Sequence, residues 1–521
     1  HKGTLRVKRS QAALLDALLA ARSDTRFVGD AGFVAVRDRL REFRGVAPRP
    51  APDGFVGALR SYQQQGLGWL WFLRELGLGG CLADDMGLGK TVQVLALLLD
   101  VHADATRQPS LLVVPRSLLD NWQREAARFT PDLRVLDFHG ADRWARLQSA
   151  GGFGAFDLVV TTYGTVRSDA ARFVEQQVRF EYVVLDEAQA IENAQSLTSK
   201  AVRLLVGEHR LALTGTPVQN HLGELWALFE FLSPGLLGKS RAFQQLLRAG
   251  RDGKGIDGKL LQRALAPFLL RRTKAEVLPE LPPKQELTIL CELDGRQQKA
   301  YAAMRAHYQK VLLGKGGKLG PQERFVALEA LLRLRQVACH EGLVDPARRA
   351  DDAAKLEALL PMLRELADGG HKALVFSQFT EFLGLVRERL DALDLRYEYL
   401  DGATTKRQEA VDRFQATDGP PLFLISLKAG GFGLNLTAAD YVFLLDPWWN
   451  PAAEAQASDR AHRLGQVRKV TVYRLIAKDT VEEKVVQLQE KKRALVDAVM
   501  GQDESLLAGM TREDLAALLA P

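Results

Sequence analysis

Asp84-Asp85-Met86-Gly87-Leu88-Gly89-Lys90-Thr91 is a glycine-rich loop between a short apolar segment, Cys81-Leu82-Ala83, and the helix-forming run Val92 to Leu99. This arrangement is typical of loops that hold nucleotide phosphates, because backbone N–H groups and the helix N-terminus point at the anion. We expect Lys90 to reach the outer phosphates and the Thr91 hydroxyl to ligate Mg²⁺. The strict pattern requires glycine where Asp84 stands, so a chance Gly-Lys-Thr turn is the alternative for this segment alone.

A second polar segment follows a buried-strand run. Tyr182-Val183-Val184-Leu185 leads into Asp186-Glu187-Ala188-Gln189. Carboxylates at the carboxyl end of a parallel strand face the ligand crevice of an α/β sheet. We expect Asp186 to hold Mg²⁺ and Glu187 to orient or activate the attacking water. An acidic helix N-cap is the alternative, but the Lys90 loop upstream favours the catalytic interpretation.

Four segments resemble the motifs of Swi/Snf-type ATPases, which are double-stranded DNA translocases of helicase superfamily 2. In chain order they are Asp84–Thr91, Asp186–Gln189, Leu213–Asn220 and Gln456–Gln466. The resemblance runs from about Leu59 to about Lys491, and its last segment is long and specific. The family also carries acidic residues where the strict phosphate loop has glycine, whereas Gln189 stands where histidine is more usual.

The resemblance implies an ATP site that takes residues from two lobes. Arg460 and Arg463, three apart on an expected helix, would share a face and stabilise charge on the γ-phosphoryl group; an ordinary exposed pair is the alternative. Arg60 and Gln63 would lie at the adenine, since an amide offers one donor and one acceptor; a polar helix start is the alternative. The other implied nucleotide-binding residues are Asp85, Met86, Gly87, Leu88, Gly89, Gln189, Gly431, Gly433 and Gln456. Thr214 begins the segment that resembles the family's coupling motif.

The implied DNA contacts lie mainly at the carboxyl ends of strands. Hydroxyl, amide and backbone N–H groups there bind phosphates and carry no sequence information. The candidates are Arg116, Ser117, Thr162, Tyr163, Gln378, Lys428 and Trp449. A buried core position is the alternative for Trp449, and we expect it more strongly for Trp448, because adjacent tryptophans cannot share a face of a regular element.

Composition excludes several classes of protein. The chain has 521 residues, 47% hydrophobic and 26% charged, which is ordinary for soluble globular domains and suggests two to four of them. A net charge of +6 permits nucleic acid as a partner. Three scattered cysteines predict neither zinc nor disulfides, and no apolar run reaches the ~18–20 residues that span a bilayer. We expect a cytoplasmic, nucleoid-associated bacterial protein, of which this chain, beginning with His1, is a fragment.

Strand-like and helix-like runs alternate in two regions, which is typical of helix-covered parallel sheets. We therefore predict an α/β fold with two parallel-sheet lobes in tandem and a helical insertion between them, and the resemblance implies that both lobes are RecA-like. The expected parts are a helical lead-in and linker (1–52), lobe 1 (53–234), the helical insertion (235–350), lobe 2 (351–480) and a C-terminal helical brace and tail (481–521).

Together these features predict an ATP- and Mg²⁺-dependent translocase on double-stranded DNA, acting as a monomer. It would remodel or displace DNA-bound protein without strand separation. Three alternatives remain open: a recycling translocase associated with RNA polymerase, the motor subunit of an anti-phage or restriction system, and a catalytically silent nucleic-acid-binding scaffold. The presence of Lys90, Asp186, Glu187, Arg460 and Arg463 argues against the scaffold.

Overall fold

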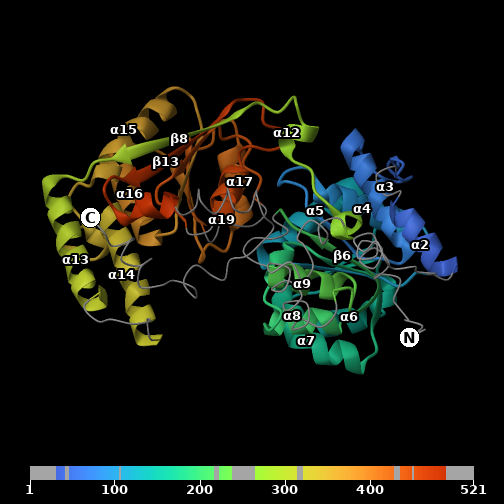
Figure 1. The fold of residues 1–521 in the computed structure, drawn as a ribbon. Coiled ribbons are helices and arrows are strands. Elements are labelled where there is room, and N and C mark those ends of the chain that lie inside the picture. The colour runs from blue at the N-terminus through green and yellow to red at the C-terminus, as the bar shows by residue number, and fades with distance from the viewer. Residues whose placement is uncertain are drawn as a thin grey trace. The chain divides into compact units, whose positions relative to one another are not determined.

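Two compact units make up the chain. A computed structural model describes residues 31–41, 46–104, 107–215, 222–237, 264–313, 321–427, 434–448 and 451–487. The division between the units falls between Pro279 and Glu280. Each unit has a parallel sheet with helices on both of its faces (Figure 1). The predicted class, two α/β lobes in tandem, is therefore confirmed.

The sheet of the first unit has seven strands among the described residues, in the order β3-β4-β2-β5-β6-β1-β7. All of its pairings are parallel, so every carboxyl end lies at the same edge. The interior strands β2 and β4 are wholly buried, as expected for apolar runs covered on both faces. The strands are β1 (Gly80–Leu82), β2 (Ser110–Val114), β3 (Val135–Asp137), β4 (Leu158–Thr162), β5 (Arg179–Leu185), β6 (Val206–Leu213) and β7 (Leu269–Leu270).

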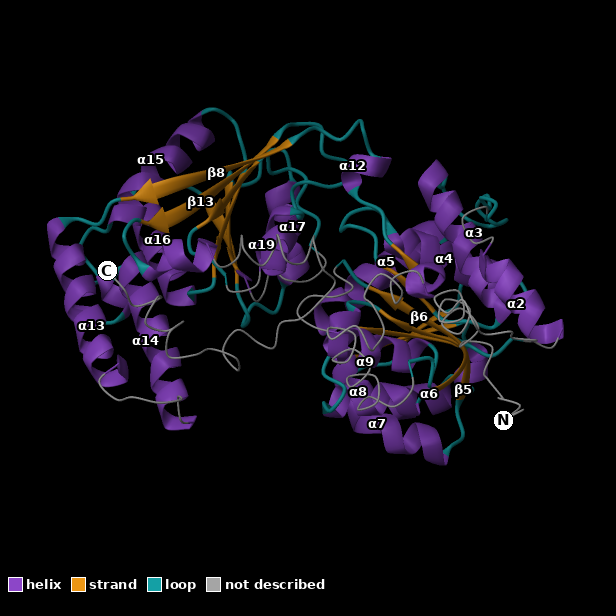
Figure 2. Ribbon diagram, in the orientation of Figure 1, coloured by secondary structure: helices purple, strands orange, loops and turns teal. Residues whose placement is uncertain are grey.

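Helices cover this sheet from two sides, and Figure 2 shows α3 to α5 on one face and α7 to α9 on the other. Helix α3 ends at Gly77, whose left-handed φ of 64° suits a residue without a side chain. Helix α7 begins after Thr162, whose hydroxyl accepts from the N–H of Thr165. The helices are α2 (Ala31–Arg41), α3 (Ser61–Leu76), α4 (Lys90–His102), α5 (Leu119–Phe129), α6 (Arg143–Ser149), α7 (Tyr163–Glu175), α8 (Leu197–Leu204), α9 (Leu222–Leu232) and α12 (Lys274–Val277).

The second unit has a six-stranded parallel sheet, again counted over the described residues, in the order β10-β11-β9-β12-β13-β8. Its strands are β8 (Lys284–Cys291), β9 (Ala373–Ser377), β10 (Tyr397–Leu400), β11 (Leu422–Ser426), β12 (Tyr441–Leu444) and β13 (Val470–Ala477). One apolar core lies between the sheet and helices α15 and α16, a second lies beneath α17 and α19, and a third joins α13, α14 and the end of β13. The helices are α13 (Gly295–Leu313), α14 (Pro321–Cys339), α15 (Ala354–Asp368), α16 (Thr380–Ala392), α17 (Arg407–Gln415) and α19 (Pro451–Ser458).

The predicted helical insertion, 235–350, is only partly right. Helices α13 and α14 form as predicted, but β7 pairs with β1 and β8 pairs with β13, so this range also supplies a strand to each sheet. Strand β7 is two residues long, and β8 is a largely exposed edge strand. Neither has the long apolar run by which a buried parallel strand is recognised. The lead-in before residue 31 and the tail after residue 487 lie outside the described residues.

Within the ranges that the structure describes, no helix combines the length and the apolar character needed to cross a membrane.

Candidate functional site

The glycine-rich loop connects β1 to α4 as predicted. Gly87 and Gly89 have left-handed φ angles of 86° and 76°, which side chains on an L-residue would disfavour. The Lys90 Nζ donates to the backbone carbonyls of Asp84, at 2.6 Å, and Asp85, at 3.3 Å. An ammonium held by two neutral carbonyls can exchange them for phosphate oxygens, which carry charge and accept more strongly.

Helix α3 holds this loop through two side chains. The Tyr62 hydroxyl and the Gln63 Nε2 both donate to the Leu88 carbonyl, at 3.0 and 3.2 Å. The Gln63 Oε1 accepts from the Arg60 N–H at 2.9 Å. Both ends of the Gln63 amide are thus bound to backbone groups here. Its predicted role at the adenine, with that of Arg60, stays a prediction.

Asp186 lies directly after β5 and is buried. Its Oδ1 accepts from the Glu187 N–H at 2.9 Å, and its Oδ2 accepts from the Trp122 indole N–H at 2.7 Å. Burial, followed by the charge of Glu187, raises the pKa of Asp186 to about 7, while the Trp122 hydrogen bond and the Lys90 charge act in the opposite direction. A bound cation would favour the ionised carboxylate.

Glu187, Gln189 and Thr214 form a hydrogen-bonded chain. Glu187 has a left-handed φ of 50°, uncommon for a residue with a side chain. The Gln189 Nε2 donates to the Glu187 Oε2 at 2.7 Å, and the Thr214 hydroxyl donates to the Gln189 Oε1 at 3.2 Å. Gln189 therefore connects the acidic segment to the first residue of the expected coupling motif. Residues 216 and 217 of that motif lie outside the described part of the chain.

The donor atoms at this edge suit Mg²⁺. The Thr91 hydroxyl and the Asp186 carboxylate are hard oxygen donors, which this ion prefers. Among the described residues, no cluster of three or more His, Cys, Asp or Glu side chains could hold a metal by itself. Magnesium usually takes one or two protein ligands and completes its shell with water and substrate phosphates, so a donor set this small fits it.

A pocket of about 410 Å³ lies beside the acidic segment, at the carboxyl ends of β2 and β4 and the start of α7. It brings together three of the predicted DNA contacts, and Ser117 is not among its lining residues. The lining consists of Val114, Pro115, Arg116, His139, Gly140, Arg143, Thr162, Tyr163, Gly164, Thr165 and Ser168.

Tyr163 links this pocket to the acidic segment. The ring lines the pocket, but its hydroxyl donates to the Asp186 carbonyl at 2.7 Å. Burial, together with the charges of Asp186 and Glu187, raises the pKa of Tyr163 well above its usual value. The hydroxyl proton of Tyr163 is therefore engaged by the Asp186 carbonyl, and the predicted contact of Tyr163 with DNA stays a prediction.

The second unit places Gln378 against a buried carboxylate. Asp446, which follows β12, accepts from the Gln378 N–H at 3.2 Å, from its side-chain Nε2, and from the Ser377 hydroxyl at 2.5 Å. Trp448 is partly buried and packs against the core, as predicted. Four of the predicted site residues lie outside the described residues: Lys428, Gly431, Gly433 and Trp449.

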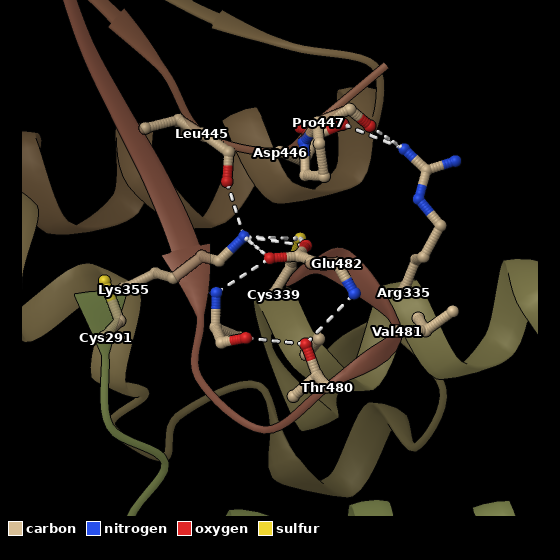
Figure 3. A network of polar contacts seen from close by, with 12 residues as sticks. Cys291, Arg335, Cys339, Lys355, Leu445, Asp446, Pro447, Thr480, Val481 and Glu482 are labelled. Atoms are coloured by element: carbon tan, nitrogen blue, oxygen red, sulfur yellow. Dashed lines mark hydrogen bonds and ion pairs between the residues drawn. The ribbon is translucent and has the colours of Figure 1, made fainter. Parts of the chain in front are cut away.

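Figure 3 shows the polar network behind Asp446. The Arg335 guanidinium donates to the Pro447 carbonyl and lies 3.8 Å from the Asp446 carboxylate. The fully buried Lys355 donates to the Leu445 carbonyl at 2.6 Å and pairs with the buried Glu482 at 2.7 Å. Every buried charge in this network thus has a partner of opposite sign.

The predicted helix carrying Arg460 and Arg463 is wrong. Helix α19 ends at Ser458, and both arginines lie in the turns that follow. The Arg460 carbonyl accepts from the Leu436 N–H, and the Gln466 amide donates to the Ala461 carbonyl, so partners elsewhere in the chain take the carbonyls that a helix would need. Arg460 is buried, whereas Arg463 is partly exposed and donates to the Leu434 carbonyl at 3.3 Å. Gln456 lies on α19 itself.

Two further residues enter the site without having been predicted. Trp122 contacts Asp186 from helix α5, and Arg272 pairs with the fully buried Asp84 of the phosphate loop. Both partners are distant in sequence, 64 and 188 residues away. A local signal does exist near Arg272, because Thr273 and Glu276 form a capping box, but it marks only the start of α12.

Family models match most of the chain. The SNF2-related domain matches residues 62–343, and the helicase conserved C-terminal domain matches residues 354–465. Two curated relatives are the putative ATP-dependent helicase/translocase YwqA of Bacillus subtilis and a SWI/SNF-related regulator of chromatin of Mus musculus. YwqA is 38% identical over 494 residues, covering 92% of this chain and 53% of the relative. The mouse protein is 38% identical over 467 residues, covering 86% and 44%.

Among solved structures, the chain is similar to the SWI2/SNF2 ATPase core of Sulfolobus solfataricus in complex with double-stranded DNA. The identity is 33%, the match covers 91% of this chain and 98% of that one, and the TM-score is 0.44. The chain spans about half the length of the curated relatives it matches. Since the SNF2-related model alone spans more than half of the chain, this protein belongs to the SNF2-related family.

Proposed function

We propose that this chain is a DNA-stimulated ATPase that moves along double-stranded DNA without separating its strands, and that it remodels or displaces DNA-bound protein. The observation that carries the proposal is the convergence at one sheet edge of the Lys90 loop, the Asp186-Glu187 pair and the pocket beside Tyr163. Curated relatives in the family are named as ATP-dependent helicases or translocases, which supports the same activity.

Each residue of the phosphate loop and acidic segment has a separate part in the proposed reaction. Lys90 binds the outer phosphates, and Thr91 and Asp186 would hold Mg²⁺, which would supply positive charge to the phosphates. Glu187 orients the attacking water and takes up its proton, with Gln189 fixing the carboxylate by the 2.7 Å hydrogen bond. Arg463 and Arg460 of the second unit stabilise negative charge on the transferred phosphoryl group.

The pocket beside Tyr163 is the proposed site for the DNA backbone in the first unit. Arg116 supplies positive charge, and the start of α7 adds backbone N–H groups that favour an anion. Such contacts do not read base sequence. DNA seated there would lie one hydrogen bond from Asp186, through Tyr163, and this proximity supports stimulation of hydrolysis by DNA.

The first test measures ATP hydrolysis with Mg²⁺ alone, with duplex DNA and with single-stranded DNA. We expect slow hydrolysis alone and strong stimulation by the duplex. Arg116→Ala should weaken stimulation and leave the DNA-free rate unchanged, whereas Lys90→Ala should abolish both. Equal stimulation by single strands, or none by either, would contradict tracking along a duplex.

Movement is tested separately from hydrolysis. A third strand bound in the major groove of a duplex should be displaced when ATP is added, while the two strands of the duplex stay paired. Displacement without ATP, or release of a duplex strand, would contradict the proposed mode of movement. The Lys90→Ala variant is the control, because it should retain DNA binding through dispersed phosphate contacts.

A further inference from the structure

A buried ion pair lies directly beneath the phosphate loop. The Arg272 Nε donates to the Asp84 Oδ1 at 2.9 Å, and its Nη2 donates to the Asp84 Oδ2, so the guanidinium grips both carboxylate oxygens. Asp84 is fully buried, and Arg272 is 8% exposed. The same guanidinium donates to the Tyr62 carbonyl and, at 2.9 Å, to the Gln93 Oε1. All of these partners belong to the loop or to the two helices that hold it.

Asp84 is an unfavourable residue for an anion-binding loop. Its carboxylate stands where the strict pattern has glycine, six residues before the lysine that would bind phosphate, and its own carbonyl accepts from Lys90 at 2.6 Å. An unpaired carboxylate here would repel the phosphates and would be costly to bury. A bidentate arginine removes both problems, because it neutralises the charge and fixes the planar carboxylate in one orientation.

The segment that carries Arg272 also runs beside the loop. The hydrogen bonds of β7 continue past its end: the Ala83 N–H donates to the Leu270 carbonyl at 2.7 Å, and the Asp85 N–H donates to the Arg272 carbonyl at 3.0 Å. In the opposite direction, the Lys274 N–H donates to the Asp85 Oδ2 at 3.0 Å. These three hydrogen bonds hold the first half of the loop against residues 270–274. That segment leads to the end of the first unit at Pro279.

We infer that Arg272 is a positioning residue for nucleotide binding. It neutralises Asp84 and thereby sets the shape and the electrostatic potential of the phosphate loop, without touching the nucleotide itself. The inference rests on the proposed function, since it concerns how the Lys90 loop takes the phosphates of ATP. It gives the pair an asymmetric role: Arg272 favours the bound phosphates, whereas Asp84, once unpaired, opposes them.

The test measures dissociation constants for ATP and ADP, with Mg²⁺, by competition against a fluorescent nucleotide. Arg272→Gln should raise both constants about tenfold or more, because it leaves a buried carboxylate next to the phosphates. Asp84→Asn alone should leave them within about threefold of wild type, since no repelling charge remains. The double variant Asp84→Asn/Arg272→Gln should bind nucleotide more tightly than Arg272→Gln, which is the signature of charge compensation.

Arg271→Gln is the matched control, because Arg271 is the adjacent and exposed arginine. It should leave nucleotide binding unchanged. Adenosine, which lacks phosphates, should compete with a constant that changes less than about threefold in Arg272→Gln, since only phosphates feel the unpaired carboxylate. The melting temperature without nucleotide shows for each variant that the chain is folded at the assay temperature.

If Arg272→Gln does not fold, Gly66→Ala provides a second test, because its added methyl group would collide with the side chains around Arg272. Its added carbon would lie 1.8 Å from the Gln93 Oε1 and 2.9 Å from the Arg272 Nη2, so it should displace the guanidinium and weaken ATP binding. A folded Arg272→Gln or Gly66→Ala variant that binds ATP as wild type does would overturn the inference. So would equal losses in Asp84→Asn and Arg272→Gln without rescue in the double variant. A wild-type chain that binds no nucleotide would instead overturn the proposed function.

Discussion

The carboxyl edges of the two sheets treat a buried aspartate in opposite ways. In the first unit, Asp186 accepts hydrogen bonds from two neutral N–H groups and lies next to a second carboxylate, Glu187, and its pKa is raised to about 7. In the second unit, Asp446 lies 3.8 Å from the Arg335 guanidinium and also accepts from Ser377 and Gln378. Among the described residues, the two adjacent carboxylates of the first edge have no salt-bridged cation, whereas Asp446 at the second edge has one.

This difference indicates at which of the two edges a bound cation would be stabilising. Burying a charge is unfavourable unless it is paired, so a folded chain normally supplies the partner. In the second unit, Arg335 is such a partner for Asp446, and Lys355 is one for Glu482 (Figure 3). In the phosphate loop, Arg272 is the partner of Asp84. The Asp186-Glu187 pair lacks a salt-bridged partner among the described residues, which is the electrostatic condition of a metal site before the metal binds.

The largest effect on stability should come from removing one partner of a buried ion pair in the second unit. Lys355→Met leaves the fully buried Glu482 unpaired and should lower the free energy of unfolding by about 3–5 kcal/mol. The double variant Lys355→Met/Glu482→Gln should recover most of that loss, because no charge remains to be paired. Denaturant titration of both variants measures the difference. Equal destabilisation in the single and double variants would show that the pair is not compensated as we describe.

The next largest effect should come from Glu187→Gln, at the carboxyl edge of the sheet in the first unit, and it concerns the rate of hydrolysis. It should lower the kcat for ATP hydrolysis by about a hundredfold or more, because the amide cannot take the proton of the attacking water. ATP binding should persist, and the melting temperature should not fall, since one of two adjacent carboxylates is removed. Glu175→Gln, an exposed position on α7, is the control. Hydrolysis at the wild-type rate would remove Glu187 from the proposed reaction.

Arg463→Ala tests whether the second unit contributes a cation to catalysis. It should lower kcat by about a hundredfold, with a much smaller change in the dissociation constants for nucleotide and DNA. Arg460→Ala should lower kcat as well, and it should also lower the melting temperature because Arg460 is buried. Arg468→Ala, which removes an exposed arginine paired with the buried Asp440, should leave kcat and both dissociation constants unchanged. An Arg463→Ala variant that hydrolyses ATP but no longer holds DNA would place this residue in the DNA path.

Trp122→Phe removes a single hydrogen bond from Asp186 and keeps most of the ring. It should lower kcat about tenfold through weaker positioning of the carboxylate, with little change in the dissociation constant for ATP. Trp144→Phe is matched to it, because the Trp144 indole donates to the Asp169 carboxylate at 2.9 Å, away from Asp186. The DNA-free ATPase rate of the two variants makes the comparison, and equal rates would deny Trp122 a positioning role.

The smallest expected effect is on how the stability of the protein depends on pH. Burial, with a further contribution from Arg74, lowers the pKa of His209 from 6.5 to about 4. The unfolded chain therefore binds a proton that the folded chain excludes, so stability falls as the pH drops from about 6.5 toward 4. His209→Gln should reduce the acid-induced shift of the melting temperature by a few degrees. His307→Gln, an exposed position in the second unit, should leave that shift unchanged.

The fold class and the main nucleotide-binding segments could be predicted from the sequence alone. Local spacing was enough for the Lys90 loop, the Asp186-Glu187 segment after β5 and the alternation of strands and helices, because each depends on neighbours along the chain. The contacts between segments far apart in sequence could be found only in the folded structure. Only the fold shows that Arg272 forms an ion pair with Asp84 and that Trp122 and Tyr163 donate hydrogen bonds to Asp186. It also shows that Arg460 and Arg463 lie in turns after α19 and not in a helix. These outcomes depend on charge compensation and hydrogen bonding between segments far apart in sequence, and local periodicity carries no information about such partners.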